Sequence, residues 1–465
     1  MILHGLWRPI TWAKFASKIG GCVRKRKAII VCAILMFVAV PTGWFVTGVI
    51  ALVFLTAFLL SGIFGPSPRY EITNRKSLAE NDSPEFLNLI EALADAKVNR
   101  TGTLEILKNG ECFYEAQLEA IRNARRSVNL EAYIFQKGAI GNRYVAALAE
   151  RARAGVQVNL TLDAFGCAGT TRSYLRPLLE AGGRVGWYNS PRWYRLTHLG
   201  NRTHRELMIV DGSMAFIGGA GVADQWFHGA HGKPRWRDNM VRVEGEAVTN
   251  LQATFAENWL ASCGEVLAGD MYFPDISCKQ ETKAMVVNST PTVGGSTRAR
   301  VLFQLLIASA KESISITTPY FLPDKSLTRE LCRAIEERGV KMRILVPGRK
   351  SDHLVTRSTS RGGYGPLLKA GAEVYEYQPA MIHAKVMCVD GLWAVVGSTN
   401  FDNRSFGIND EVNLAVCDAD FAGQLERDTS ADLLESRRVS LEEWTHRPLT
   451  ERAPELLGWI FERQQ

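Results

Sequence analysis

The sequence predicts an α/β protein made of two similar repeats, each a mainly parallel sheet flanked by helices, behind an N-terminal transmembrane segment. Three observations predict it. A long uncharged stretch lies near the N-terminus, helices alternate with short β-rich stretches through the rest of the 465 residues, and the same order of elements occurs twice. We expect a pseudo-twofold axis to relate the two copies, and a site built from both to lie between them.

The charge of the chain is concentrated at its start. Lys and Arg number 55 and Asp and Glu 48, yet seven of the basic residues and no acidic residue fall within residues 1–27. The rest of the chain therefore carries no formal net charge. This balance disfavours a basic body that binds nucleic acid. The nine cysteines include no CxxC pair and no spacing typical of zinc ligands.

The uncharged stretch, residues 28–64, contains 37 residues without Asp, Glu, Lys, Arg or His. A bilayer crossing takes about 20 apolar residues, so this segment can cross once or turn as a hairpin. The basic residues before it predict a cytoplasmic N-terminus. Pro41, Gly43 and Gly48 favour a hairpin that returns the chain to the cytoplasmic side, whereas a single crossing would place the body outside. Both topologies stay open.

Residues 65–108 read as a linker and a packing helix. Ser83 precedes Pro84 and Glu85, which is the pattern of a capped helix start with Pro in the first turn. Apolar residues then follow at helical spacing, beginning at Phe86. We expect this helix to lead the chain into the folded body.

The repeat is visible as helix, strand, helix, strand. Residues 119–135 and 307–321 each read as a helix running into a strand, and in both copies another helix, a glycine and an apolar strand follow. A further helix then ends in an Ala-Gly pair in each copy. We place the first domain at 109–265 and the second at 280–430, and residues 431–465 form a C-terminal tail.

A histidine opens a strand at the same place in each copy. The first strand reads His204-Arg-Glu-Leu-Met-Ile-Val-Asp211, and the second reads His383-Ala-Lys-Val-Met-Cys-Val-Asp390. Alternate residues of an extended strand share a face, so Lys385 points the same way as the histidine two residues before it.

These motifs resemble those of the phospholipase D superfamily. The second copy matches the HxKxxxxD signature, and residues 397–400 supply its Gly-Ser-x-Asn continuation. Asp238 and Glu411 lie in flanking segments that are also similar to that superfamily. One such motif alone is a weak pattern, but two in register within a repeat are a strong one. With its N-terminal membrane segment, the chain most resembles the bacterial cardiolipin synthases, over residues 80–430.

The resemblance implies roles for the two histidines and their partners. His204 would be the nucleophile that forms a phosphohistidine, and His383 the general acid and base. Glu411 would orient His204 and Asp238 would orient His383, each from the opposite repeat. The chemistry requires no metal ion and no other cofactor.

The remaining motif residues would bind the phosphate or complete the catalytic set. Lys385, Ser398 and Asn400 would hold the non-bridging phosphate oxygens, on which negative charge must be stabilised in the transition state. Asp211 and Asp390 complete the two motifs and are counted with the catalytic residues. Their position at the turns after the strands also fits a purely structural role.

The first motif departs from the family pattern at one position. Glu206 stands where the pattern has Lys, and Gly221 stands where an Asn matching the second copy would be expected. A carboxylate facing the phosphate would repel it unless the carboxylate is protonated or paired, for instance with Arg202. Because its side chain would face the phosphate, we expect Glu206 to be a substrate-binding residue. Three interpretations follow: a rearranged phosphate clamp, a different acceptor or substrate, or impaired catalysis.

The function expected from the resemblance is phosphatidyl transfer at a bacterial inner membrane. Two phosphatidylglycerols would give cardiolipin and glycerol, with a phospholipid and the membrane as partners and no nucleic acid. A phospholipase D that hydrolyses lipid headgroups is the alternative enzyme. A lipid-binding scaffold that has lost turnover through Glu206 is the alternative of another class. The sequence does not indicate the oligomeric state.

Overall fold

The computed structural model describes residues 48–56, 70–190, 200–230, 232–276, 282–290, 298–352, 354–448 and 451–452. Most of the predicted membrane segment, residues 28–47 and 57–64, lies outside the described residues. Residues 48–56 are helical, and their apolar side chains are largely exposed. Within the described ranges, no helix combines the length and the apolar character that a bilayer crossing requires. The described residues from 70 to 452 belong to one compact unit.

The compact unit begins with the predicted packing helix. A short 3-10 helix, Arg75–Ser77, precedes α4, Pro84–Ala94. The Ser83 hydroxyl accepts the amide of Phe86, as expected for a capped start. Phe86 and Ile90 are fully buried against the second repeat, whereas Leu93 is exposed.

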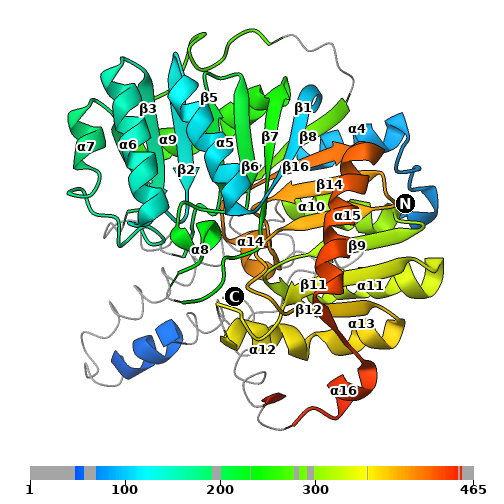
Figure 1. The fold of residues 1–465 in the computed structure, drawn as a ribbon. Coiled ribbons are helices and arrows are strands. Elements are labelled where there is room, and N and C mark those ends of the chain that lie inside the picture. The colour runs from blue at the N-terminus through cyan, green and yellow to red at the C-terminus, as the bar shows by residue number, and fades with distance from the viewer. Residues whose placement is uncertain are drawn as a thin grey trace, which may run out of the picture. The chain divides into compact units, whose positions relative to one another are not determined.

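The elements of the first repeat follow the predicted alternation of helices and strands. They are β1 Val98–Lys108, α5 Asn109–Asn123, β2 Ser127–Ala132, α6 Ala139–Arg153, β3 Gln157–Asp163, α7 Arg176–Glu180, β4 Arg184–Tyr188, β5 Glu206–Val210, β6 Met214–Gly218, α8 Asp224–Phe227, β7 Asn239–Gly245 and α9 Ala247–Cys263. Figure 1 shows this repeat in cyan and green.

The second repeat runs through the same series and ends in a short tail, drawn from yellow-green to red in Figure 1. Its elements are β8 Thr282–Ser289, α10 Arg298–Ser309, β9 Ser313–Thr317, β10 Phe321–Leu322, α11 Lys325–Arg338, β11 Lys341–Pro347, α12 Leu354–Gly362, α13 Tyr364–Ala370, β12 Glu373–Tyr377, β13 Val386–Val389, β14 Trp393–Gly397, β15 Phe401–Asp402, α14 Asn403–Gly407, β16 Glu411–Cys417, α15 Ala419–Leu434, β17 Ser436–Val439 and α16 Leu441–Thr445.

Both repeats contribute to one continuous sheet. Its strand order is β17-β12-β11-β9-β13-β14-β16-β8-β1-β7-β6-β5-β2-β3-β4. Starting from the central β8–β1 pair, the strands occur in corresponding order in both directions, as two copies of one unit require. The chain thus has an α/β fold with two similar halves, and the halves meet edge to edge through β1 and β8.

The expectation of a mainly parallel sheet is wrong, because the large sheet is mixed. In its described strands, parallel pairing is confined to β2–β3, β3–β4, β9–β11 and β11–β12. The motif strands β5 and β13 instead turn back on β6 and β14 as hairpins. An Asp-Gly turn, with both residues at positive φ, follows each motif strand: Asp211-Gly212 and Asp390-Gly391. This turn chemistry favours a hairpin over the crossover that a parallel pair needs.

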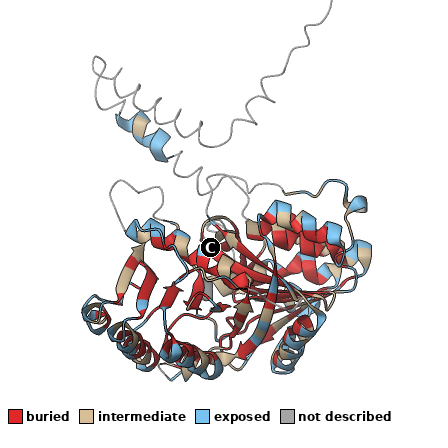
Figure 2. Ribbon diagram, turned by 90° about the horizontal axis from the view of Figure 1, so that it is seen from above, coloured by how far each residue is buried: buried red, intermediate tan, exposed pale blue. Residues whose placement is uncertain are grey.

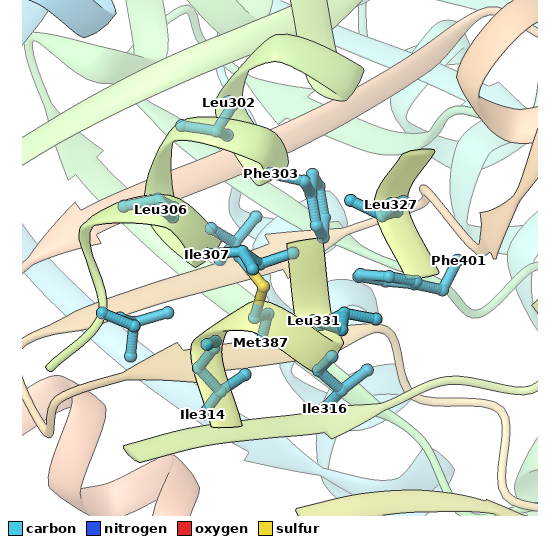
Figure 3. Close-up of a cluster of buried hydrophobic side chains, with 14 of the residues drawn as sticks. Leu302, Phe303, Leu306, Ile307, Ile314, Ile316, Leu327, Leu331, Met387 and Phe401 are labelled. Atoms are coloured by element: carbon cyan, nitrogen blue, oxygen red, sulfur yellow. The ribbon is translucent and has the colours of Figure 1, made fainter. Parts of the chain in front are cut away.

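Helices cover both faces of the sheet, and the buried residues concentrate between them (Figure 2). Helices α9 and α15 share one apolar cluster with the sheet, which includes Leu207 of β5 and Val386 of β13. The opposite face is covered by α5 and α6 in the first repeat and by α10 and α11 in the second. Figure 3 shows part of the latter core, where Leu306 and Ile307 of α10 lie near Met387 of β13.

Candidate active site

His383 lies directly before β13, where its backbone amide donates to the carbonyl of Arg237 at 2.7 Å. Its Nδ1 atom is 3.0 Å from an Asp238 carboxylate oxygen, and the Asp238 side chain is fully buried. Trp226 donates its indole N–H to the same oxygen at 3.0 Å. Although burial raises the pKa of Asp238, the hydrogen bond and charge of His383 outweigh it and hold that pKa below its usual value. Asp238 is thus a fixed, ionised partner for the imidazole.

His204 occupies the corresponding place before β5. Its backbone amide donates to the carbonyl of Asp410 at 2.8 Å. Its Nδ1 atom is 3.3 Å from a Glu411 carboxylate oxygen and 3.2 Å from the carbonyl of Ser398. The Tyr133 ring packs beside the imidazole, with 5.2 Å between ring centroids. The Nε2 atom of each histidine is therefore the nitrogen that does not face its orienting carboxylate.

Each histidine takes its carboxylate from the other repeat. Asp238 directly precedes β7 in the first repeat but contacts His383 of the second. Glu411 of β16, in the second repeat, contacts His204 of the first. The structure thus brings together the four residues that the sequence assigned to one site. The site lies where the two halves adjoin.

Lys385 lies next to His383 within this site. Its Nζ atom is 2.8 Å from Nδ1 and 3.1 Å from Nε2 of that histidine. Burial lowers the pKa of Lys385 to about 8, although the negative charges of Asp238, Glu411 and Glu206 act to raise it. Burial and the charge of Lys385 in turn lower the pKa of His383 to about 4, so the imidazole is neutral at pH 7 when no substrate is bound.

Glu206 is buried on the first motif strand and is bonded to backbone amides. One of its carboxylate oxygens accepts the amides of Tyr133 at 3.2 Å and Ile134 at 3.3 Å. Burial raises its pKa well above the usual range, although these bonds and the charge of Lys385 oppose the rise. Burial thus favours the protonated form of this carboxyl group, whereas the two amides and Lys385 favour the carboxylate.

The ion pair considered between Glu206 and Arg202 is not formed in the described part of the chain. The guanidinium of Arg202 instead lies over the Phe165 ring, 4.4 Å from its centroid. Gly221 lies against Glu206, since a Cβ atom there would come 2.5 Å from the carbonyl of Ile134 and 3.0 Å from the Glu206 carboxylate. Glu206 and Gly221 therefore fit each other, and an Asn at 221 would collide with this arrangement.

Asn400 and Ser398 differ in what their side chains contact. The buried Oδ1 atom of Asn400 has no hydrogen-bond partner among the described residues, so it can accept from a ligand hydroxyl, whereas a phosphate oxygen would have to meet the NH2 group. The Ser398 hydroxyl donates to Glu411 and accepts the amide of Val412 at 3.1 Å. These contacts favour a role for Ser398 in holding Glu411 rather than in binding phosphate.

Asp211 and Asp390 lie at the opposite ends of their strands from the histidines. The Asp211 carboxylate accepts the amides of three consecutive residues, 125–127, at 2.7–3.1 Å. Asp390 accepts the amides of residues 311–313 in the same way, at 2.8–3.2 Å. Each carboxylate therefore fixes the chain that enters β2 or β9. These contacts favour the structural role of the two aspartates over a catalytic one.

Sequence reasoning assigned no role to two aromatic neighbours of the histidines. Trp226 packs edge-on against His383, with 5.2 Å between centroids, and Tyr133 lies beside His204. Tyr133 directly follows β2, and the carboxyl end of a parallel strand is a common location for site residues. Trp226 carries no comparable signal in the sequence.

Among the described residues, no group of three or more His, Cys, Asp or Glu side chains is arranged to hold a metal ion.

Comparison with known proteins identifies the family to which the chain belongs. The family model described as "Cardiolipin synthase, PLD-like domain" matches residues 118–259 and 304–433, one segment in each repeat. The chain is 32% identical to cardiolipin synthase 1 of Bacillus anthracis over 83% of this chain and 76% of that protein. It is also 32% identical to the major cardiolipin synthase ClsA of Bacillus subtilis, over 84% and 81% of the two chains.

Solved structures agree on the fold. A phosphatidylserine synthase from Haemophilus influenzae superposes with a TM-score of 0.64 over 81% of this chain and 99% of that one, at 14% sequence identity. At this identity the likeness concerns the fold alone. The family match and the relatives show that the chain is an enzyme of the phospholipase D superfamily and belongs to the cardiolipin synthase family.

Proposed function

We propose that this enzyme is a membrane-anchored phosphatidyltransferase that makes cardiolipin and glycerol from two molecules of phosphatidylglycerol through a phosphohistidine. The observation that carries the proposal is the pairing of each histidine with a carboxylate from the other repeat, beside the ammonium group of Lys385. Two differently placed imidazoles and one fixed cation are what a double displacement at phosphorus requires.

In the first step, His204 attacks the phosphorus of one phosphatidylglycerol through Nε2. The N–P bond forms as the P–O bond to the glycerol headgroup breaks, and His383 supplies the proton that the departing glycerol takes up. Glu411 holds the opposite nitrogen of His204 and stabilises the positive charge that the ring acquires. Family analogy, rather than geometry, makes His204 the nucleophile.

In the second step, the terminal hydroxyl of another phosphatidylglycerol attacks the phosphohistidine. The hydroxyl gives its proton to His383, the new P–O bond forms, and the N–P bond breaks to release cardiolipin. Water in place of the lipid hydroxyl would give phosphatidic acid by the same step. Transfer is favoured when the site excludes water, and both histidines are at least partly buried here.

The electrostatics of the site fit an acid that acts only after substrate has bound. The charge of Lys385 helps to lower the pKa of His383 to about 4 in the empty site. A phosphate anion beside Lys385 compensates that charge, so the pKa of His383 rises when the substrate binds. The histidine then holds a proton where the leaving alkoxide needs one.

Glu206 supports an adapted phosphate clamp rather than a damaged one. Burial raises the pKa of its carboxyl group, which is bonded to two backbone amides and fits against Gly221. The phosphate is then held by Lys385 and the side-chain NH2 group of Asn400, while the Glu206 carboxyl group is turned to the amides of Tyr133 and Ile134. This arrangement argues against the lipid-binding scaffold.

Membrane anchoring and an inner-membrane location rest on residues 28–64. The stretch is uncharged throughout, and the described helical residues 48–56 expose Val53 at 59% and Phe54 at 52%. Exposed apolar side chains of this kind suit a lipid environment. A hairpin that keeps the active site on the cytoplasmic side remains our preferred topology.

Headgroup exchange tests the double displacement. Purified full-length enzyme would be incubated with phosphatidylglycerol and labelled glycerol, and label would be followed into phosphatidylglycerol. A phosphohistidine predicts exchange by the wild type, and none by His204→Ala or His383→Ala. Cardiolipin formation without any exchange would contradict the covalent intermediate.

A further inference from the structure

A buried polar cluster lies behind His204, on the face of the sheet that α9 covers. It consists of Glu131 of β2, Thr203, Arg205, Asp410 and Asn258 of α9. All five are at most 4% exposed. None of them lies on the strand face that carries His204 and Glu206, so the mechanism above does not use them.

Thr203, the residue before His204, is held at its hydroxyl and at its backbone amide. Its hydroxyl donates to the Glu131 carboxylate, and its amide donates to Asp163 at 3.0 Å. It also forms a β-bridge with Asp410, whose carbonyl accepts the His204 amide. Asn258 donates to the same Glu131 oxygen at 2.6 Å. Glu131 therefore ties the backbone next to the nucleophile to β2 and to α9.

Arg205, the residue after His204, is anchored to the same helix. It donates to the carbonyl of Thr254 at 2.7 Å and to the carboxylate of Glu257 at 3.1 Å. The charges of Glu131 and Asp410 also act on it and raise its pKa, against the effect of burial. The cluster thus holds the chain on both sides of His204.

The second repeat offers an internal comparison, because its strands pair in the same register. Glu131 pairs with Leu207, three residues after His204, and Thr317 pairs with Val386, three residues after His383. Thr317 therefore corresponds to Glu131. By the same count Ile382 corresponds to Thr203 and Ala384 to Arg205. These three residues offer no carboxylate, no hydroxyl before the histidine and no cation after it.

The second repeat anchors its histidine differently. Arg237 corresponds to Asp410. Its guanidinium forms an ion pair with the Asp432 carboxylate, with 2.8 Å between nitrogen and oxygen. Side-chain hydrogen bonds that hold the residue before the histidine are thus a feature of the first repeat. We call the bond between Thr203 and Glu131 the clamp. A nucleophile has to be held at bonding distance from phosphorus, and an error of about 1 Å can lower the rate by two orders of magnitude.

We propose that Glu131 is a positioning residue for His204, acting through the hydroxyl of Thr203. This inference rests on the proposed function, since it assigns the clamp to the histidine that forms the covalent bond. Glu131 touches no substrate and takes no part in proton transfer. Its loss leaves the buried Thr203 hydroxyl without its acceptor, although Asn258 still donates to that hydroxyl at 3.3 Å, and lets the segment that carries His204 shift.

Three variants and one control test the proposal in the full-length enzyme. Glu131→Leu removes the clamp, Thr203→Val removes only the hydroxyl that Glu131 accepts, and Glu131→Gln keeps an acceptor for both Thr203 and Asn258. Thr317→Val changes the corresponding strand of the second repeat. The measured quantities are headgroup release from short-chain phosphatidylglycerol in a single turnover, KM, and hydrogen exchange of residues 202–206 and 381–385.

Glu131→Leu and Thr203→Val should slow headgroup release about tenfold with KM unchanged, because they disturb position and not binding. Exchange in residues 202–206 should accelerate, while residues 381–385 stay as in the wild type. Glu131→Gln and Thr317→Val should resemble the wild type in both readouts.

Wild-type release and wild-type exchange in Thr203→Val would overturn the proposal, and this single-atom change keeps the test valid if Glu131→Leu does not fold. Equal loss in Glu131→Gln and Glu131→Leu would also overturn it, because the clamp would then not act through acceptance from Thr203. Hydrogen exchange requires no turnover. It therefore decides the positioning role even if the wild type fails to act on phosphatidylglycerol.

Discussion

Lys385 is the charged group that holds the phosphate in the proposed mechanism. Its Nζ atom lies against His383, and burial lowers its pKa to about 8. Its protonation state therefore changes within an accessible pH range, unlike that of an exposed lysine. The first motif supplies no second cation, because Glu206 stands where the family pattern has lysine.

The pKa of Lys385 predicts an alkaline limb in the pH dependence of kcat/KM. Lys385 is charged below pH 8 and loses its charge above it, so kcat/KM should fall as the pH rises through about 8. Lys385→Met should lower kcat/KM about 100-fold, as expected for the loss of a transition-state cation. In Lys385→Arg the charge persists, so the limb should move to higher pH. An unchanged limb in that variant would contradict the assignment.

Glu206→Lys, which restores the family pattern, should lower turnover rather than raise it. The change leaves the amides of Tyr133 and Ile134 without their acceptor and sets a second ammonium group beside Lys385. We expect about a tenfold loss of kcat, because the pocket geometry is disturbed.

Glu206→Gln is the matched control. It keeps an acceptor for the two amides and should stay close to wild-type turnover. A gain of activity in Glu206→Lys would show that Glu206 impairs the clamp.

The residues that we propose to bear the chemistry were easier to predict from the sequence than the residues that contact them. His204, His383 and their carboxylates follow from motif positions, and the structure brings them together. Trp226 and Tyr133 contact the histidines only through the tertiary fold, and no spacing in the chain indicates such contacts. Ser398 has a motif position as well, yet its hydroxyl is bonded to Glu411.

At the scale of the element, the Asp-Gly turns determine how each motif strand continues. Asp211 and Asp390 take positive φ angles of 54° and 55°, and each accepts three backbone amides. The predicted helices and strands were largely correct, because local periodicity specifies them. Their pairing was not, since the hairpin turns after the motifs outweigh the helix–strand alternation from which parallel pairing was expected.

Asp211→Ala should destabilise the protein without disabling the site. The loss of three hydrogen bonds to a charged acceptor, with Ala forced into a left-handed conformation, should cost about 3 kcal/mol in unfolding free energy. Asp211→Asn keeps an acceptor and tolerates positive φ, so its loss should be about 1 kcal/mol. Denaturant unfolding measures both. A variant of wild-type stability but without activity would instead support a catalytic Asp211.

At the scale of the whole molecule, the hairpin topology predicts where natural cysteines can be labelled. Cys112 and Cys263 are both exposed thiols of the compact unit. If the body is cytoplasmic, a membrane-impermeant maleimide should modify neither in intact spheroplasts and both after lysis. Peptide mapping by mass spectrometry reads the outcome. Modification before lysis would establish a single crossing with the body outside.

The central claim is that one site built from both repeats transfers a phosphatidyl group between two lipids. The most direct test supplies purified full-length enzyme in detergent with phosphatidylglycerol as the sole lipid, and follows lipid products and free glycerol. We predict cardiolipin and glycerol in equal amounts from the wild type and neither from His383→Ala. Phosphatidic acid without cardiolipin, or cardiolipin formation that survives in His383→Ala, would contradict the account.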